Sequence, residues 1–215
     1  MTRAWVRFWG FAGAIALPAV LCQAAKEFSM PKAQPAFSYP AHDHHASENV
    51  TIALDPYDTS AKANIFVVNY QAHELLPMFL VITNDGDQPV ETSAMNAELV
   101  TADRSKLSPA GEDDILRRIS HPQASATRGP LPFPTKKVKG TVGSAERNEI
   151  QNAQFRARAV ESHSSQAGFL FFDVAELPNP LPGARFYLTG LRDSSGHPLM
   201  YFEVSLDKYL AGKAP

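Results

Sequence analysis

The stretch L-P-M-F-L-V-I-T-N-D-G-D-Q-P-V, residues 76–90, decides the fold because it joins a clear strand pattern to a clear turn pattern. Residues 79–82 are aromatic or β-branched apart from one leucine, and the apolar run is too short for a typical helix. It predicts a central, buried strand. Residues 84–87 then tolerate positive φ or bond their own backbone, and Pro89 cannot donate to a central ladder. The chain is therefore predicted to turn directly after this strand.

Further strands are predicted on both sides of this stretch. Alternating or buried-strand patterns bounded by turn residues occur at 50–54, 64–70, 97–101, 168–174, 184–189 and 199–206. The run at 168–174 is apolar enough to be buried on both faces. About seven strands without a helix long enough to cover a parallel sheet predict a mainly β protein, an immunoglobulin-like antiparallel β-sandwich.

A helical insertion is predicted at 105–157, where strand alternation stops. Ser108-Pro109 fits a helix start, with acidic residues early at 112–114 and arginines late at 117–118, as the helix dipole favours. A second helix is predicted near 144–157. A loop this long inside a domain is usually functional or disordered, so the insertion is the first place to look for function.

The N-terminus has the order of a signal peptide at 1–25, with Arg3 and Arg7 before an apolar run and a small-residue cleavage site. Export to the periplasm or the extracellular space follows. The alternatives are an uncleaved anchor, for which the run is short, and lipidation of Cys22, which Leu21 disfavours. Membrane contact is expected only in those two cases.

The composition predicts one domain at 49–210, preceded by a Pro-rich extended arm or linker at 26–48. The chain is 44% hydrophobic with 17 prolines, which suits a single core with many loops. Loss of 1–25 removes two of the 20 Lys and Arg and none of the 22 Asp and Glu, which leaves 18 against 22, a formal charge of −4. This mild acidity excludes a nucleic-acid partner, and loss of Cys22, the single cysteine, excludes disulfides and thiolate chemistry.

The order of motifs resembles a family of secreted bacterial immunoglobulin-like domains of uncharacterised function, often found in lipoproteins. The resemblance rests on T-N-D-G-D-Q-P-V after a strand, on M-N-A-E-L-V, and on the polar residues 161–166 before A-G-F-L-F-F-D-V. It covers about residues 50–206. The chain departs from the family in its helical insertion and in lacking a convincing lipidation site. The resemblance implies the sandwich fold and no catalytic residues.

A histidine cluster, His42, His44 and His45 with Asp43 between them, is the densest group of metal-capable side chains. Imidazoles with a carboxylate suit zinc, copper or nickel. In an extended arm His42 and His44 point one way while Asp43 and His45 point the other, so a closed site needs another ligand. The candidates for that ligand are His73, His121, His163 and His197. The alternative is a polar arm whose histidines only face solvent. Metal capture would weaken as pH falls through the reference value of about 6.5 for histidine.

Catalytic motifs are not visible in the sequence. Glu112, Asp113 and Asp114 diverge by about 100° per residue on a helix and do not converge on one bond. The sequence has no G-x-S-x-G, P-loop or H-E-x-x-H motif.

The predicted function is therefore an exported, non-enzymatic binding or structural module of unknown ligand, with a possible protein partner at 105–157. A His-arm metal-binding protein and an enzyme whose site is not visible in sequence are the alternatives. No cofactor can be assigned.

Overall fold

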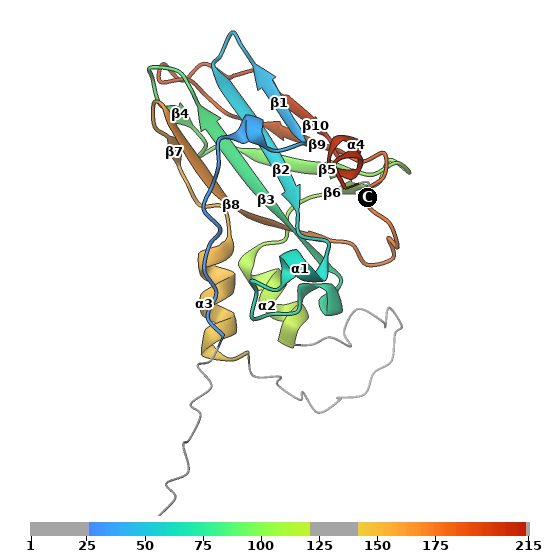
Figure 1. The fold of residues 1–215 in the computed structure, drawn as a ribbon. Helices are drawn as coiled ribbons and strands as arrows, with labels where there is room; N and C mark the ends of the chain where they lie inside the picture. The colour runs from blue at the N-terminus through green and yellow to red at the C-terminus, as the bar shows by residue number, and fades with distance from the viewer. Residues whose placement is uncertain (1–25, 121–141, 214–215) are drawn as a thin grey trace, which may run out of the picture.

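The structure is a computed structural model that describes residues 26–120 and 142–213. In this part of the chain the protein is mainly β, with antiparallel sheets at one end and several short helices at the other (Figure 1). The predicted signal segment at 1–25 and the loop between the two predicted insertion helices lie outside the described residues. Within the described ranges, no helix is both long and apolar enough to cross a membrane.

Two four-stranded sheets and one two-stranded ribbon make up the β structure of the described residues. The first sheet contains, in spatial order, β1 (His42–His45), β2 (Val50–Pro56), β3 (Leu75–Asn84) and β8 (Ser164–Asp173). The second contains β10 (Phe202–Ser205), β9 (Arg185–Thr189), β5 (Asn96–Val100) and β6 (Lys106–Leu107). The ribbon pairs β4 (Val90–Glu91) with β7 (Ala159–Val160). Every pairing of these strands is antiparallel.

The central strand predicted from residues 76–90 is confirmed as β3. All ten of its residues are buried, and it pairs with β2 on one side and β8 on the other. The predicted turn follows at once, because the Asn84 side chain accepts the N–H of Gly86 at 3.0 Å and donates to the Gln88 carbonyl at 2.7 Å. Asn84 therefore holds the bend that ends the strand.

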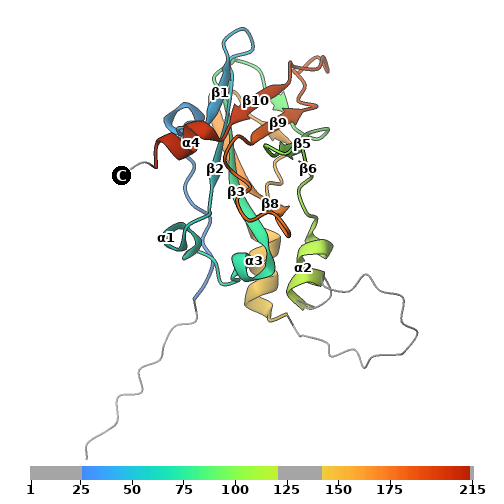
Figure 2. The ribbon, with the colours of Figure 1, turned by 90° about the vertical axis from the view of Figure 1, so that its right-hand side faces the viewer.

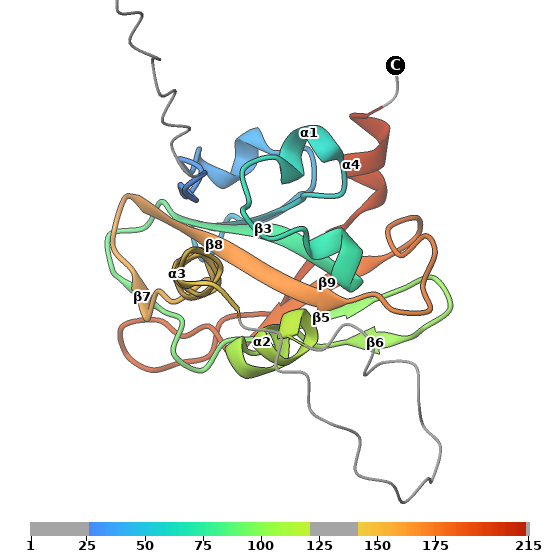
Figure 3. The ribbon, with the colours of Figure 1, turned by 90° about the horizontal axis from the view of Figure 1, so that it is seen from below.

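Two hydrophobic cores explain why β3 shows no polar alternation. One lies between the two sheets and takes Ile52, Leu80 and Phe186, among others. The second lies on the other face of the first sheet, where Phe79, Phe169 and Phe171 point. The first sheet is thus a middle layer, with the second sheet on one side and the N-terminal arm and the helix at residues 60–63 on the other (Figure 3).

Short helices and the N-terminal arm cover the second core (Figure 2). They are η1 (Ala36–Ser38), α1 (Ser60–Ala63), η2 (Tyr70–His73), α2 (Glu112–Ser120) and α3 (Ser144–Ala153). A further helix, α4 (Asp207–Ala211), follows β10. The two predicted insertion helices are confirmed as α2 and α3, and each buries an isoleucine in the second core, Ile115 and Ile150. They are part of the folded body and not an appendage to it.

The strand predicted at 64–70 is wrong. Phe66, Val68 and Tyr70 do alternate and are buried, but they pack as a loop over Phe169 and Phe171. The backbone N–H groups of Val67 and Val68 bond a side chain, Glu149, and not a neighbouring strand. Alternation here reflects one buried face of a loop.

Three predicted boundaries also change. Residues 42–45 of the predicted arm form β1, which pairs with β2, and are not part of a linker. The helix start expected at Ser108-Pro109 falls later, because Pro109 bridges to Phe172 before α2 begins at Glu112. The second helix ends at Ala153 and not at 157, because the chain then runs extended along β8.

Gly168 in β8 allows this extended segment to dock. A Cβ at position 168 would lie 2.4 Å from the Cα of Phe155, whose N–H bonds the Phe169 carbonyl at 3.1 Å. Gly168→Ala should therefore lower the free energy of unfolding by about 1–3 kcal/mol, as overpacking against backbone does. Chemical denaturation measures this.

Gly111→Ala is the matched control, because a Cβ there meets only the Asp114 side chain at 3.9 Å. Equal stabilities of the two variants would show that the segment after α3 does not press against β8.

Candidate functional site

A buried carboxylate on α3, that of Glu149, lies at the centre of the candidate site. α3 begins after Gly143, whose N–H bonds the Glu146 side chain at 2.7 Å, and it turns Ile150 and Ala153 toward the second core. Glu149 lies on the same face and is 2% exposed. Its Oε1 accepts the N–H of Val68 at 3.2 Å, and its Oε2 accepts the N–H of Val67. One carboxylate thus fastens α3 to the loop before η2.

Burial raises the pKa of Glu149 above its ordinary value. The N–H groups of Val67 and Val68, the nearby hydroxyl of Tyr70 and the ammonium of Lys26 lower the pKa of Glu149, because they favour the charged form, but desolvation is the larger effect. A carboxyl group whose pKa is perturbed by burial inside a cavity wall is a feature of functional sites as well as of structural ones.

The hydroxyl of Tyr70 is the second buried polar group here. Tyr70 is 2% exposed, and its hydroxyl lies close to the Glu149 carboxylate but makes no hydrogen bond of normal geometry to it or to any other described residue. Burial raises the pKa of Tyr70, and the neighbouring Glu149 carboxylate raises it further. An unsatisfied buried hydroxyl costs about 1–3 kcal/mol, so its presence calls for an explanation.

Two adjoining cavities open above these groups. The first, about 270 Å³, is lined by Tyr70 and by polar side chains that include Lys26, Ser60, Asn64, Asn69 and Gln71. The second, about 310 Å³, lies between the N-terminal arm and α3, where Lys26, Phe28, Ser144, Asn148, Glu149 and Asn152 line it. Lys26 belongs to both, and its ammonium donates to the Asn64 side chain at 3.4 Å.

The chemistry of the lining is mostly neutral and hydrogen-bonding. Ser144, Asn148 and Asn152 are spaced by four residues and so form one polar stripe along α3. Amide and hydroxyl groups can both donate and accept, whereas the one ammonium, on Lys26, lies near the carboxylate of Glu149. Such a lining suits a ligand that also carries many neutral donors and acceptors.

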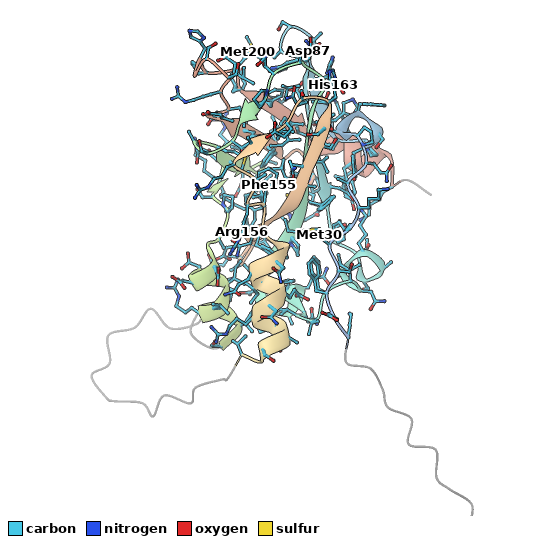
Figure 4. All side chains as sticks on the ribbon, turned by 90° about the vertical axis from the view of Figure 1, so that its left-hand side faces the viewer. Met30, Asp87, Phe155, Arg156, His163 and Met200 are labelled. Carbon is cyan, nitrogen blue, oxygen red and sulfur yellow. The ribbon has the colours of Figure 1, made fainter. Side chains whose placement is uncertain are left out.

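The second cavity runs along α3. In Figure 4, Phe155 and Arg156 mark the end of α3 nearest the sheets, and the lining residues at 144–152 precede them along the helix. Glu112 of α2 is tied to the same region by Gln151 at 2.9 Å and Arg156 at 2.7 Å. Glu112, the first residue of the acidic run at 112–114, therefore helps to hold α2 against α3.

Sequence reasoning missed Glu149, Tyr70 and Lys26 as site residues. One signal was available for Glu149, which is four residues before Ala153 and adjacent to Ile150, so it belongs on the apolar face of its helix. A charged residue on such a face is either paired or functional. The sequence pattern places Tyr70 in a strand and Lys26 in the arm, so no local signal brings the three residues together.

The predicted metal ligands lie in β1, away from this cavity. His42 and His44 point to one face of the strand and His45 to the other, as alternation requires. Within the described residues, no three His, Cys, Asp or Glu side chains are grouped so that they could hold one metal ion. His163 and His197 instead contact Asp87 and Asp193, at 3.0 and 3.4 Å, and His121 lies outside the described residues.

Comparison of the chain with protein-family models and with curated proteins found no match. Among solved structures, the chain is similar to the X-ray structure of a Northeast Structural Genomics Consortium target, SoR45, at 12% sequence identity and a TM-score of 0.32. The likeness covers 74% of this chain and 87% of that one. A likeness at this level carries no argument about fold or function.

Proposed function

We propose that this protein is an exported, non-enzymatic binding module whose ligand site is the pair of polar cavities where α3 meets the loop before η2. The observation that carries the proposal is Tyr70, which lines the first cavity and whose buried hydroxyl, beside the Glu149 carboxylate, makes no hydrogen bond of normal geometry to a described residue. A ligand that accepts its hydrogen would remove the cost of leaving it unpaired. Export rests on the signal-peptide pattern of residues 1–25.

The immunoglobulin-like sandwich is part of the same proposal. In that fold, one sheet holds strands A, B and E, and the other holds G, F and C, with an added C′ in some members. The order β2-β3-β8 corresponds to A-B-E, and β10-β9-β5-β6 corresponds to G-F-C-C′, which supports this assignment. The helices α2 and α3 occupy the chain positions at which strand D would occur. Function on such a scaffold is expected in its variable connections.

The ligand class that suits the cavities is a small, neutral molecule with several hydroxyl or amide groups. The lining side chains donate and accept at several points, which matches hydroxyl groups that do the same. An anionic ligand finds no net positive charge, because the lining that contains Lys26 also contains Glu27 and Glu149. Recognition would then depend on the number of hydrogen bonds formed.

A thermal-shift screen tests the proposal. We expect at least one compound from a panel of neutral mono- and disaccharides and polyols to raise the melting temperature with the concentration dependence of simple binding, because a ligand that binds only the folded state stabilises it. Amino acids, dicarboxylates and phosphate form the charged comparison set. Tyr70→Phe should weaken binding of the active compound about tenfold, which corresponds to about 1.4 kcal/mol.

Asn179→Ala is the matched control, because Asn179 lines a different cavity, beside Leu177 and Pro178. It should bind like the wild type. Compounds that shift the wild type and Tyr70→Phe equally would remove these cavities as the site, and a panel in which only charged compounds bind would overturn the ligand class. A protein partner at 105–157 stays a separate prediction, which pull-downs with and without the active compound would address.

A further inference from the structure

Strand β1 separates the three clustered histidines into two groups with different environments. His42 is opposite Ala53 and His44 is opposite Thr51, and Ala53 belongs to the second core, on the face of the first sheet away from the second sheet. Asp43 and His45 are opposite Ile52 and Val50, which belong to the core between the sheets. The imidazoles of His42 and His44 therefore share the outer face of an edge strand.

Hydrogen bonds hold the rings of His42 and His44 by the same nitrogen. The Nδ1 atom of His42 lies 2.6 Å from the Tyr39 carbonyl oxygen, which can only accept, so Nδ1 carries the hydrogen. The neutral ring then presents its lone pair at Nε2. The Nδ1 atom of His44 lies 2.9 Å from the Thr51 hydroxyl, on a side chain that is itself buried. Metal-binding histidines are commonly held in this way through the nitrogen that does not bind the metal.

His45 is engaged at both nitrogens and is not free to bind a metal. Its Nδ1 lies 2.9 Å from Glu48 and its Nε2 3.3 Å from Asp43, and its ring stacks on Phe202 with centroids 3.9 Å apart. The two carboxylates in turn accept backbone N–H groups of β10 and of the segment just before it. These are Met200 at 2.8 Å and Glu203 at 2.9 Å. His45 thus fastens β1 to β10.

We propose that His42 and His44 form a two-histidine site for one divalent transition-metal ion, bound through their Nε2 atoms, with water in the remaining positions. Residues two apart on a strand are about 6–7 Å apart and point the same way, which lets two imidazoles reach one ion. Copper should bind more tightly than nickel or zinc, as expected for nitrogen ligands. The ammonium of Lys208 donates to the His42 carbonyl at 3.1 Å. Among the described residues, it is the one charged side chain that hydrogen-bonds His42 or His44. Because it carries the same sign of charge as the metal ion, it lowers the affinity of the site.

Calorimetric titration of the full chain with copper(II) tests this assignment. The wild type should bind one copper ion, and His42→Ala and His44→Ala should each weaken binding at least tenfold. His45→Ala should bind copper as the wild type does while it loses thermal stability. His163→Ala is the matched control, because His163 lies at the exposed tip beside Asp87, on another part of the surface (Figure 4).

Electron paramagnetic resonance of the copper complex supplies a second measurement that does not depend on a variant folding. Hyperfine structure from two coordinated imidazoles is the expected result. One or three coordinated imidazoles, or unchanged titrations for His42→Ala and His44→Ala, would overturn the proposal. Because the site lies on β1, its failure would leave the cavity beside Tyr70 unaffected, and the reverse is also true.

Discussion

Phe169→Ala should lower the free energy of unfolding by about 3–5 kcal/mol, as expected for removal of a buried phenylalanine. Phe169 is fully buried in β8, at the middle of the second core. Its ring centroid lies 4.8 Å from that of Tyr57, 4.9 Å from that of Phe66 and 5.0 Å from that of Phe79. The substitution removes these contacts together and leaves a cavity beneath the helical layer. Urea denaturation followed by circular dichroism measures the loss.

Phe37→Ala is the control for this variant, because Phe37 is 61% exposed. It should change stability little, as surface substitutions usually do. If Phe169→Ala and Phe37→Ala were equally stable, the helices and the N-terminal arm would not form a core with the first sheet, and the cavities between them would lose their fixed walls.

Glu149→Ala should lower the free energy of unfolding by about 2–4 kcal/mol, because it leaves two backbone N–H groups without their acceptor. The backbone N–H groups of Val67 and Val68 both donate to the Glu149 carboxylate, and Val68 is buried. The loss should concentrate at the helical end, where hydrogen exchange of these two amides would accelerate. Arg147→Ala, an exposed position on the same helix, should stay close to the wild type.

The pH dependence of stability gives this prediction a second test. The folded state holds the pKa of Glu149 above its ordinary value of 4.5, so the folded protein binds this proton more tightly than the unfolded chain does. The contribution of the protonated Glu149 carboxyl group to stability is fully present below pH 4.5, and it is lost as the pH rises through the raised pKa of the folded state. Glu149→Gln cannot titrate, so the wild type should lose stability relative to it over that interval. A difference that does not vary with pH, or that grows as pH rises, would contradict the raised pKa.

The sequence predicted those parts of the fold that are determined by short, local patterns. The apolar run and the Asn84 turn of residues 76–90 carry the information for β3, and the alternation at 184–189 does the same for β9. The strand at 64–70 was wrong because a buried loop face and a strand give the same alternation. Local pattern could not tell which partner the backbone of Val67 and Val68 would find.

The candidate site was beyond sequence reasoning for a related reason. Lys26, Tyr70 and Glu149 come from the arm, η2 and α3, and only the packing of the second core brings them together. None of them belongs to a spaced motif. The histidine cluster, by contrast, was visible, and strand alternation correctly predicted that His45 points away from His42 and His44.

The ligand-binding role of the Tyr70 hydroxyl is tested most directly by the stability of Tyr70→Phe without any ligand. Because the hydroxyl has no partner among the described residues, its removal should leave the free energy of unfolding unchanged or raise it by up to about 1 kcal/mol. A loss of about 1 kcal/mol or more would mean that the hydroxyl donates to the Glu149 carboxylate in the folded protein. It would then be a structural group, and the reason for placing a ligand beside it would be gone.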